Sequence, residues 1–238
     1  MLLSGGRLSN FCPVVSAKPY NFVTPVHLRC VSLSYSVEVV CMANKDIVVI
    51  GASYGGVEAL KVLISGLPEG FHASVFLVQH RRSTAPGLLP LILMKAGPLP
   101  ASFPADFEPI ERGHIYVAPP DYHMMLERGL VRLTHDPKEN HVRPAIDALF
   151  RSAAYAYGPR VVGVVLTGLL HDGTAGLWVV KDRGGTAIVQ DPEGAIAPSM
   201  PQSALQNVAV DYCLPLDEIA PLLAQLVSTP TSRLFCDP

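Results

Sequence analysis

Residues 47–56, which read IVVIGASYGG, place a β-branched apolar run directly before a glycine-rich turn. Residues 57–67 then repeat apolar side chains at helical spacing. This predicts a buried strand, a tight turn and a helix, with the Ser53 hydroxyl in the turn. Such strand–helix units build α/β folds around a parallel sheet. Their turns lie at the carboxyl ends of the strands, where open α/β sheets place their chemistry.

Strand-like and helix-like segments alternate along the rest of the chain. Strands are predicted over 73–78, 113–117, 160–166, 186–190 and 212–215, with a hairpin over 124–133. Helices are predicted over 85–94, 145–157, 175–182, 200–207 and 217–227. Repeated βα units predict an α/β fold with a doubly wound, mainly parallel sheet and helices on both faces, in a Rossmann-like three-layer arrangement.

Charge and cysteine usage argue against several classes of protein. The net charge of −2, with 49% apolar and 16% charged residues, gives no electrostatic case for nucleic acid or a membrane surface. No apolar stretch reaches the roughly 18 residues of a membrane span. The cysteines show neither CxxC nor metal-ligand spacing, as is typical of reduced thiols in the cytoplasm; they are Cys12, Cys30, Cys41, Cys213 and Cys236. We expect no metal.

Residues 1–41 differ from the rest of the chain. They contain Arg7, Lys18 and Arg29 against a lone Glu38, show no sustained period, and lack the clean apolar core of a signal peptide. Met42 opens MANKDIVVI, which is a typical beginning of an α/β domain. We therefore expect residues 42–238 to form the domain, and residues 1–41 to be an extension that the native protein lacks.

Ser53 is a candidate nucleophile. It follows a buried strand and precedes a helix N-terminus, where free N–H groups favour negative charge. Acyl transfer needs an exposed hydroxyl and donors for the oxyanion. The alternative is a turn that binds an anion or nothing, although Ser53 replaces the second glycine of a GxGxxG motif.

His80 and Asp172 are the candidate partners of Ser53. His80 ends the strand that follows the Ser53 unit, and Asp172 lies in the turn before the helix over 175–182. A triad needs a histidine base and an acid that fixes its tautomer. The alternatives are a capping or surface histidine and a helix N-cap aspartate. Backbone N–H groups near Tyr54, Gly168 and Leu169 are candidate oxyanion donors, and His123 is a candidate lining residue.

The order Ser, His, Asp differs from the Ser, acid, His order of α/β-hydrolases. Instead, residues 47–226 resemble the catalytic domain of CheB-type chemotaxis protein-glutamate methylesterases. The matching motifs are IGASYGG with Ser53, VQH with His80, YVAPPDYH at 116–123, RPAIDALFRSAA at 143–154, LTGLLHDGTAGL at 166–177 and QDPEGAIAPSMPQSAL at 190–205.

The resemblance implies a doubly wound α/β fold and assigns roles to three residues. Ser53 would be the nucleophile, His80 the general base and then acid, and Asp172 the orienting carboxylate. The implied substrates are γ-glutamyl methyl esters on the cytoplasmic helices of methyl-accepting chemotaxis receptors, with no cofactor. Receptor methyltransferase and histidine-kinase signalling components are further candidate partners, and glutamine deamidation is a chemically adjacent activity.

The chain departs from the family pattern at several points. Tyr54 replaces a small residue after the nucleophile, and we expect its bulk to narrow the mouth of the site. Leu169 replaces the usual methionine, which leaves its backbone N–H in place. Arg81 and Arg82 are either solvated or face an acidic receptor surface. Residues 1–41 are too few and too poorly patterned to form the family's receiver domain, so we expect the catalytic unit to work without one. The rival functions are a non-catalytic anion- or receptor-binding module and a small-molecule esterase.

Overall fold

The computed structural model describes residues 44–80 and 87–228. The expected extension over 1–41 and the pair Arg81–Arg82 therefore lie outside the described residues. The strands are β1 Ile47–Ala52, β2 Ser74–Gln79, β3 Ala101–Ser102, β4 Glu108–Pro109, β5 Ile115–Val117, β6 His123–Glu127, β7 Leu130–Thr134, β8 Val161–Val165, β9 Thr186–Gln190 and β10 Tyr212–Leu214. The α-helices are α1 Gly56–Ser65, α2 Leu89–Ala96, α3 Ile146–Tyr157, α4 Thr174–Asp182, α5 Ser199–Asn207 and α6 Leu216–Ser228.

Seven strands form one sheet in the order β10-β9-β8-β1-β2-β5-β3. Every ladder in this sheet is parallel. β6 and β7 form the predicted hairpin, and β4 extends it into a small antiparallel sheet. The predicted helix over 85–94 begins later, at Leu89, in the described part of the chain. The predicted parallel α/β architecture is confirmed.

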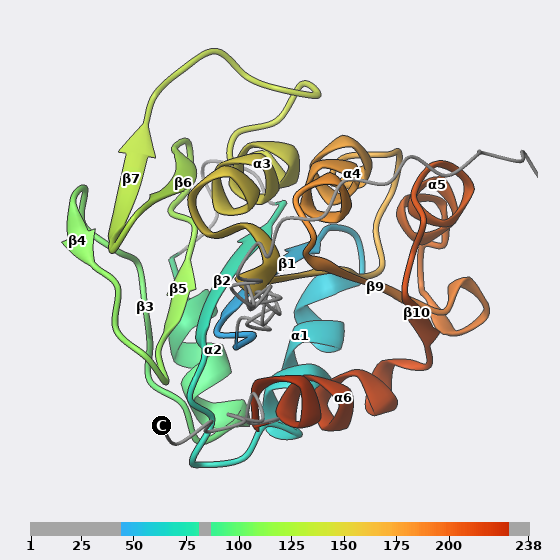
Figure 1. The fold of residues 1–238 in the computed structure, drawn as a ribbon, viewed down its shortest axis with the longest axis horizontal. Coiled ribbons are helices and arrows are strands. Elements are labelled where there is room, and N and C mark those ends of the chain that lie inside the picture. The colour runs from blue at the N-terminus through green and yellow to red at the C-terminus, as the bar shows by residue number, and fades with distance from the viewer. Residues whose placement is uncertain (1–43, 81–86, 229–238) are drawn as a thin grey trace, which may run out of the picture. The chain divides into compact units, whose positions relative to one another are not determined.

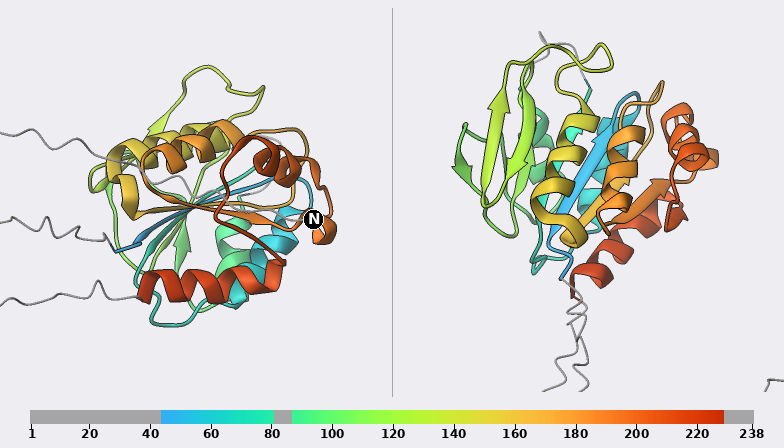
Figure 2. Two further views of the ribbon diagram at one scale, coloured as in Figure 1. Left: turned by 45° about the vertical axis from the view of Figure 1, so that its right-hand side comes forward. Right: turned by 45° about the horizontal axis from the view of Figure 1, so that its top comes forward.

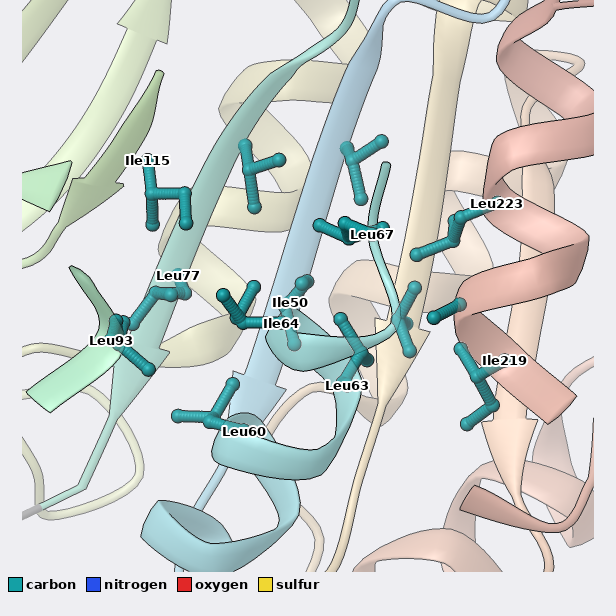
Figure 3. Close-up of a cluster of buried hydrophobic side chains, with 14 of the residues drawn as sticks. Ile50, Leu60, Leu63, Ile64, Leu67, Leu77, Leu93, Ile115, Ile219 and Leu223 are labelled. Atoms are coloured by element: carbon teal, nitrogen blue, oxygen red, sulfur yellow. The ribbon is translucent and has the colours of Figure 1, made fainter. Parts of the chain in front are cut away.

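Helices cover both faces of the large sheet (Figures 1 and 2). α3, α4 and α5 lie on one face, and α1, α2 and α6 lie on the other. Because side chains alternate along a strand, β1 supplies both layers: Val48 and Ile50 join the core beneath α1, whereas Ile47 and Val49 join the core beneath α3. Figure 3 shows the first core, where α1 and α6 pack leucine and isoleucine side chains against β1 and β2.

The central position of β1 creates the place for a site. From β1 the chain first moves to β2 on one side, and it later returns through β8 on the other side. Such a reversal is a topological switch point, where the loops after neighbouring strands separate and leave a crevice. At the N-cap of α1, Gly55 has φ of +78°, a conformation that strains any residue with a side chain. The glycine turn predicted at residues 51–56 thus delivers Ser53 to this crevice.

We expect Gly97→Ala to destabilise the fold without altering the crevice. A Cβ on Gly97 would overlap the Ile64 carbonyl oxygen and lie 2.8 Å from Ile64 Cγ2, so α2 would have to move away from α1. Overpacking of this kind costs about 1–3 kcal/mol, measurable by urea unfolding. Gly70→Ala is the matched control, because a Cβ there meets nothing within 4 Å. Equal stability of the two variants would contradict the prediction.

Candidate active site

Ser53 and His80 directly follow two adjacent parallel strands, β1 and β2, at paired positions of the ladder. Ala52 and Gln79 are paired in the parallel ladder between β1 and β2, and Ser53 and His80 are the next residues of each strand. The backbone holds both: Ser53 N–H donates to the Thr167 carbonyl at 3.0 Å, and His80 N–H donates to the Ala52 carbonyl at 3.0 Å. The two candidates are therefore neighbours because of strand register.

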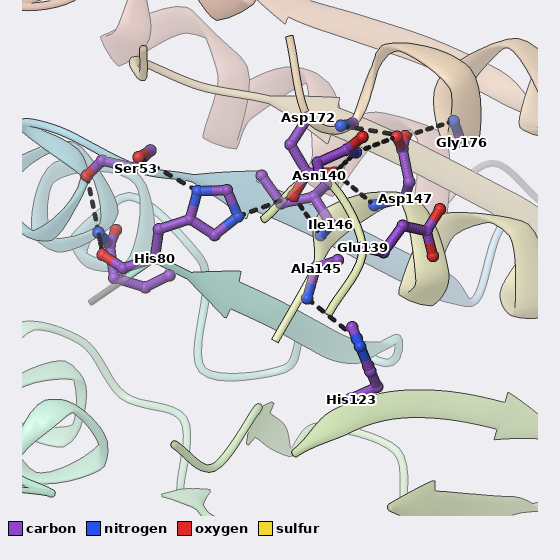
Figure 4. A network of polar contacts seen from close by, with 12 residues as sticks. Ser53, His80, His123, Glu139, Asn140, Ala145, Ile146, Asp147, Asp172 and Gly176 are labelled. Carbon is purple, nitrogen blue, oxygen red and sulfur yellow. Dashed lines mark hydrogen bonds and ion pairs between the residues drawn. The ribbon is translucent and has the colours of Figure 1, made fainter. Parts of the chain in front are cut away.

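Asp172 reaches the same point from the loop between β8 and α4. His80 lies between the other two side chains, with Nδ1 3.2 Å from Ser53 Oγ and Nε2 2.7 Å from Asp172 Oδ2 (Figure 4). The N-cap of α4 is Gly173, which leaves the Asp172 carboxylate free to face His80 instead of capping its own helix. The structure thus brings the three predicted side chains into one hydrogen-bonded row.

The hydrogen bonds define which nitrogen of His80 carries the proton. An ionised Asp172 can only accept, so Nε2 carries the hydrogen and Nδ1 is left to accept from Ser53 Oγ–H. In the familiar serine-protease triad, Nε2 faces the serine and Nδ1 faces the acid. The ring is used the other way round here, but each nitrogen still has the partner that general-base chemistry requires.

The N-terminus of α3 holds the Asp172 carboxylate. Ile146 N–H donates to Oδ2 at 2.7 Å, and Asp147 N–H donates to Oδ1 at 3.1 Å. α3 has no side-chain cap of its own, so Asp172 satisfies two of its free N–H groups and lies at the positive end of the helix dipole. Burial raises the pKa of Asp172, but hydrogen bonds from His80 and the Ile146 N–H outweigh it and lower the pKa overall.

A second buried carboxylate stands behind the first. This second carboxylate belongs to Asp147. The amide group of Asn140 binds both carboxylates, because Nδ2 donates to Asp172 Oδ1 at 2.7 Å and to Asp147 Oδ2 at 2.8 Å. Asp147 Oδ1 also accepts from the N–H groups of Gly173 at 3.0 Å and Gly176 at 2.6 Å. Burial and the negative charge of Asp172 raise the pKa of Asp147. Asn140 therefore screens two carboxylates that would otherwise repel each other.

Two backbone N–H groups beside Ser53 are available as oxyanion donors. Within residues 44–80 and 87–228, neither the Tyr54 N–H nor the Leu169 N–H has a hydrogen-bond partner. Gly168, by contrast, donates its N–H to the Ala197 carbonyl at 2.9 Å, so its predicted role as an oxyanion donor is wrong. A Cβ on Gly168 would lie 2.8 Å from Ser53 Cβ and overlap Met200 Sδ, so glycine is needed there for close packing.

Several supporting residues escaped the sequence reasoning. Gln79 is buried at the end of β2, and its Nε2 donates to the carbonyl oxygens of Ser53 at 2.7 Å and His80 at 3.0 Å. A polar residue at the end of this mainly apolar strand was the available signal.

His123 does not line the site, contrary to the prediction. It is buried, accepts from Ala145 N–H at 3.2 Å and contacts the Pro137 carbonyl. It fixes the chain that leads into α3.

The triad opens into a depression of about 240 Å³. Its lining residues are Ser53, His80, Asn140, His141, Val142, Leu169, Leu170, His171 and Asp172. Tyr54 is not among them, and its side chain is 64% exposed. Tyr54 therefore does not line the depression, and a role in restricting the substrate stays a prediction. Among the described residues, no three His, Cys, Asp or Glu side chains gather to hold a metal ion. No helix there is long and apolar enough to cross a bilayer.

This fold and this row of side chains define an α/β protein with the geometry of a serine hydrolase. Comparison with known proteins agrees: the CheB methylesterase family model matches residues 48–223. A putative protein-glutamate methylesterase/protein-glutamine glutaminase of Leptospira interrogans is 38% identical over 184 residues, which cover 77% of this chain and 95% of that protein. The chain belongs to the CheB methylesterase family.

Two further relatives place the match more closely. Protein-glutamate methylesterase/protein-glutamine glutaminase 1 of Rhodospirillum rubrum is 41% identical over 181 residues, which cover 74% of this chain but only 47% of that protein. The crystal structure of the Thermotoga maritima CheB methylesterase catalytic domain superposes with a TM-score of 0.72 at 36% identity. The match covers 78% of this chain and all of that domain. The similarity therefore lies in the catalytic domain.

Proposed function

We propose that this protein hydrolyses γ-glutamyl methyl esters on chemoreceptors in the cytoplasm, with Ser53 as nucleophile. The observation that carries the proposal is the alignment of Ser53 Oγ, His80 and Asp172 at 3.2 and 2.7 Å. The family model and the relatives are named for methylesterase activity on protein glutamate. The methyl ester of a protein glutamate is therefore the substrate that we propose.

The first half of the reaction transfers the glutamyl group to Ser53. His80 Nδ1 takes the Oγ proton as Oγ bonds to the ester carbonyl carbon, and the carbonyl oxygen becomes an oxyanion. The N–H groups of Tyr54 and Leu169 are placed to donate to that oxygen. Each such donor is worth about 10²-fold or more in rate. The C–O bond to the methoxy group then breaks, and the leaving oxygen takes the proton from His80 as methanol departs.

The second half returns the enzyme to its starting state. A water molecule gives a proton to His80 Nδ1 while its oxygen attacks the acyl carbon, and the same two N–H groups hold the new oxyanion. Collapse breaks the bond to Ser53 Oγ, which recovers its proton from His80. The product is a free glutamate side chain. Asp172 stays ionised throughout and stabilises the imidazolium that forms twice in each cycle.

Glutamine deamidation is a second candidate activity. The same steps release ammonia in place of methanol when the substrate is a receptor glutamine. The printed names of the relatives in Leptospira interrogans and Rhodospirillum rubrum include protein-glutamine glutaminase. A protein that only binds an anion is the weaker alternative. Anion binding requires neither a hydrogen bond between histidine and serine nor one between that histidine and a carboxylate.

Methanol release from methylated chemoreceptor membranes tests the proposal. We expect the full chain to release methanol from receptors labelled on the methyl group, and a fluorophosphonate to label Ser53. A short acyl ester supplies the comparison substrate. Hydrolysis of the short ester without methanol release would favour a small-molecule esterase. Failure of both reactions, with no fluorophosphonate label, would identify a binding module and overturn the proposal.

A further inference from the structure

A groove runs along α4 beside the catalytic depression. Its volume is about 510 Å³, and α4 lies between walls from α3 and α5. Its lining residues are Arg151, His171, Thr174, Ala175, Trp178, Val179, Ser203 and Asn207. His171 also lines the depression that contains Ser53. His171 is thus the shared edge of the depression and the groove, so the groove lies next to the site.

Trp178 is the dominant side chain of this groove. It is the sole tryptophan of the chain, and it is 55% exposed. Its neighbours Leu177 and Val180 are fully buried, so α4 already packs its inner face and leaves its largest apolar side chain outward. Tryptophan is enriched where proteins bind one another, because its large ring contributes contact area at little entropic cost.

The depression beside the groove also exposes apolar side chains. Leu169 and Leu170 are 55% and 70% exposed, and both line the depression. The edges of the groove are polar but carry no strong charge: Arg151 is paired with Glu139, and Thr174 Oγ1 contacts Ser203 Oγ at 2.9 Å. An apolar floor with polar edges suits an amphipathic helix.

The direction of α4 sets the register of such a helix. α4 starts two residues after Asp172, and Trp178 lies one turn beyond Thr174, or about 6 Å further along the axis. A helix laid along α4, with one side chain at Ser53, would therefore have residues of its neighbouring turns beside Trp178. A small ester held at Ser53 does not extend that far.

We propose that the groove along α4 docks the helix of the protein substrate that carries the esterified glutamate, with Trp178 as its main contact. The inference rests on the proposed methylesterase function. It adds a specificity-determining surface outside the triad, which allows the enzyme to recognise a helical protein segment instead of an isolated ester. The occupant is an amphipathic helix whose apolar side chains lie on the same face as the reactive glutamate.

Trp178→Ala separates recognition of the helix from chemistry at Ser53. We expect kcat/KM for methylated receptor to fall roughly 30-fold relative to kcat/KM for a short acyl ester, chiefly through KM, as for a buried interface tryptophan. Tyr155→Ala is the matched control: Tyr155 is 63% exposed on α3 and does not line the groove, so the ratio stays at the wild-type value. An unchanged ratio for Trp178→Ala would overturn the proposal, as would an equal loss with both substrates.

Tryptophan fluorescence gives a second readout that needs no turnover. Because Trp178 is the sole tryptophan, its emission in full-length Ser53→Ala protein should shift to the blue and saturate as a methylated receptor fragment is added. If this shift is seen but the wild-type protein releases no methanol, the proposed reaction is rejected and the docking site is retained. The absence of a shift with receptor would reject the docking site. The same shift on raising the protein concentration alone would also reject it, because the occupant of the groove would then be a second copy of the chain.

Discussion

We expect Ser53→Ala to reduce methanol release to the background rate, a loss on the order of 10⁶-fold in kcat. The fold should survive, because the backbone of Ser53 is held by bonds that do not involve its hydroxyl. Its N–H donates to the Thr167 carbonyl, and its carbonyl accepts from Gly56 N–H at 2.9 Å and Gln79 Nε2 at 2.7 Å. The measurement is single-turnover and steady-state methanol release, with urea unfolding alongside.

Ser65→Ala is the control for this variant. Ser65 ends α1, and in the part of the chain that the structure describes its hydroxyl donates to the Val62 carbonyl alone, at 2.8 Å. Its loss should therefore leave turnover near the wild-type rate. Retention of a substantial rate by Ser53→Ala would show that another group attacks the ester. The nucleophilic role proposed for Ser53 would then have to be abandoned.

Asp172→Asn should lower kcat by about 10⁴-fold, as loss of the acid does in related chemistry. Asp172 accepts at both oxygens, from His80, Asn140 and two N–H groups of α3. An asparagine must turn its NH₂ group toward one set of these donors, so it either loses its bond to His80 or leaves helix N–H groups unpaired. The first outcome frees the His80 ring to take the other tautomer, and either outcome removes the negative charge that stabilises the imidazolium.

The same variant has a pH signature in stability. The folded-state pKa of Asp172 is lowered, so its ionised form stabilises the fold above about pH 4, and this contribution is lost as the pH falls through the folded-state pKa. The stability gap between wild type and Asp172→Asn should therefore narrow as the pH is lowered from 7 toward 3. Asp182→Asn, on an exposed residue at the end of α4, serves as control. A gap that widens in acid would contradict the assignment.

The sequence allowed prediction of the parts of the site that depend on strand order. Ser53 and His80 each follow a buried strand, so their meeting required only that the two strands pair in parallel. The fold could also be predicted, because β-branched runs and helical periods alternate along the chain. The roles of the triad in catalysis stay predictions until the variants are measured.

The support behind Asp172 depends on tertiary contacts that no local pattern encodes. Asn140 lies in a loop with left-handed backbone, φ of +51°, and meets Asp172 across 32 positions of sequence. Asp147 lies in the first turn of α3, and nothing in the local sequence showed that its side chain faces the loop before α4. The error at Gly168 has a similar origin, because the sequence could not reveal that the Ala197 carbonyl takes its N–H.

The shared amide of Asn140 also makes the site vulnerable to chemical ageing. Asparagine side chains slowly lose ammonia in water, and the product here would be an aspartate in contact with two other carboxylates. Both donated hydrogen bonds would vanish, and a third negative charge would arrive where two are already buried. The loss of this one amide would therefore weaken the hold on Asp172 without any change in Ser53 or His80.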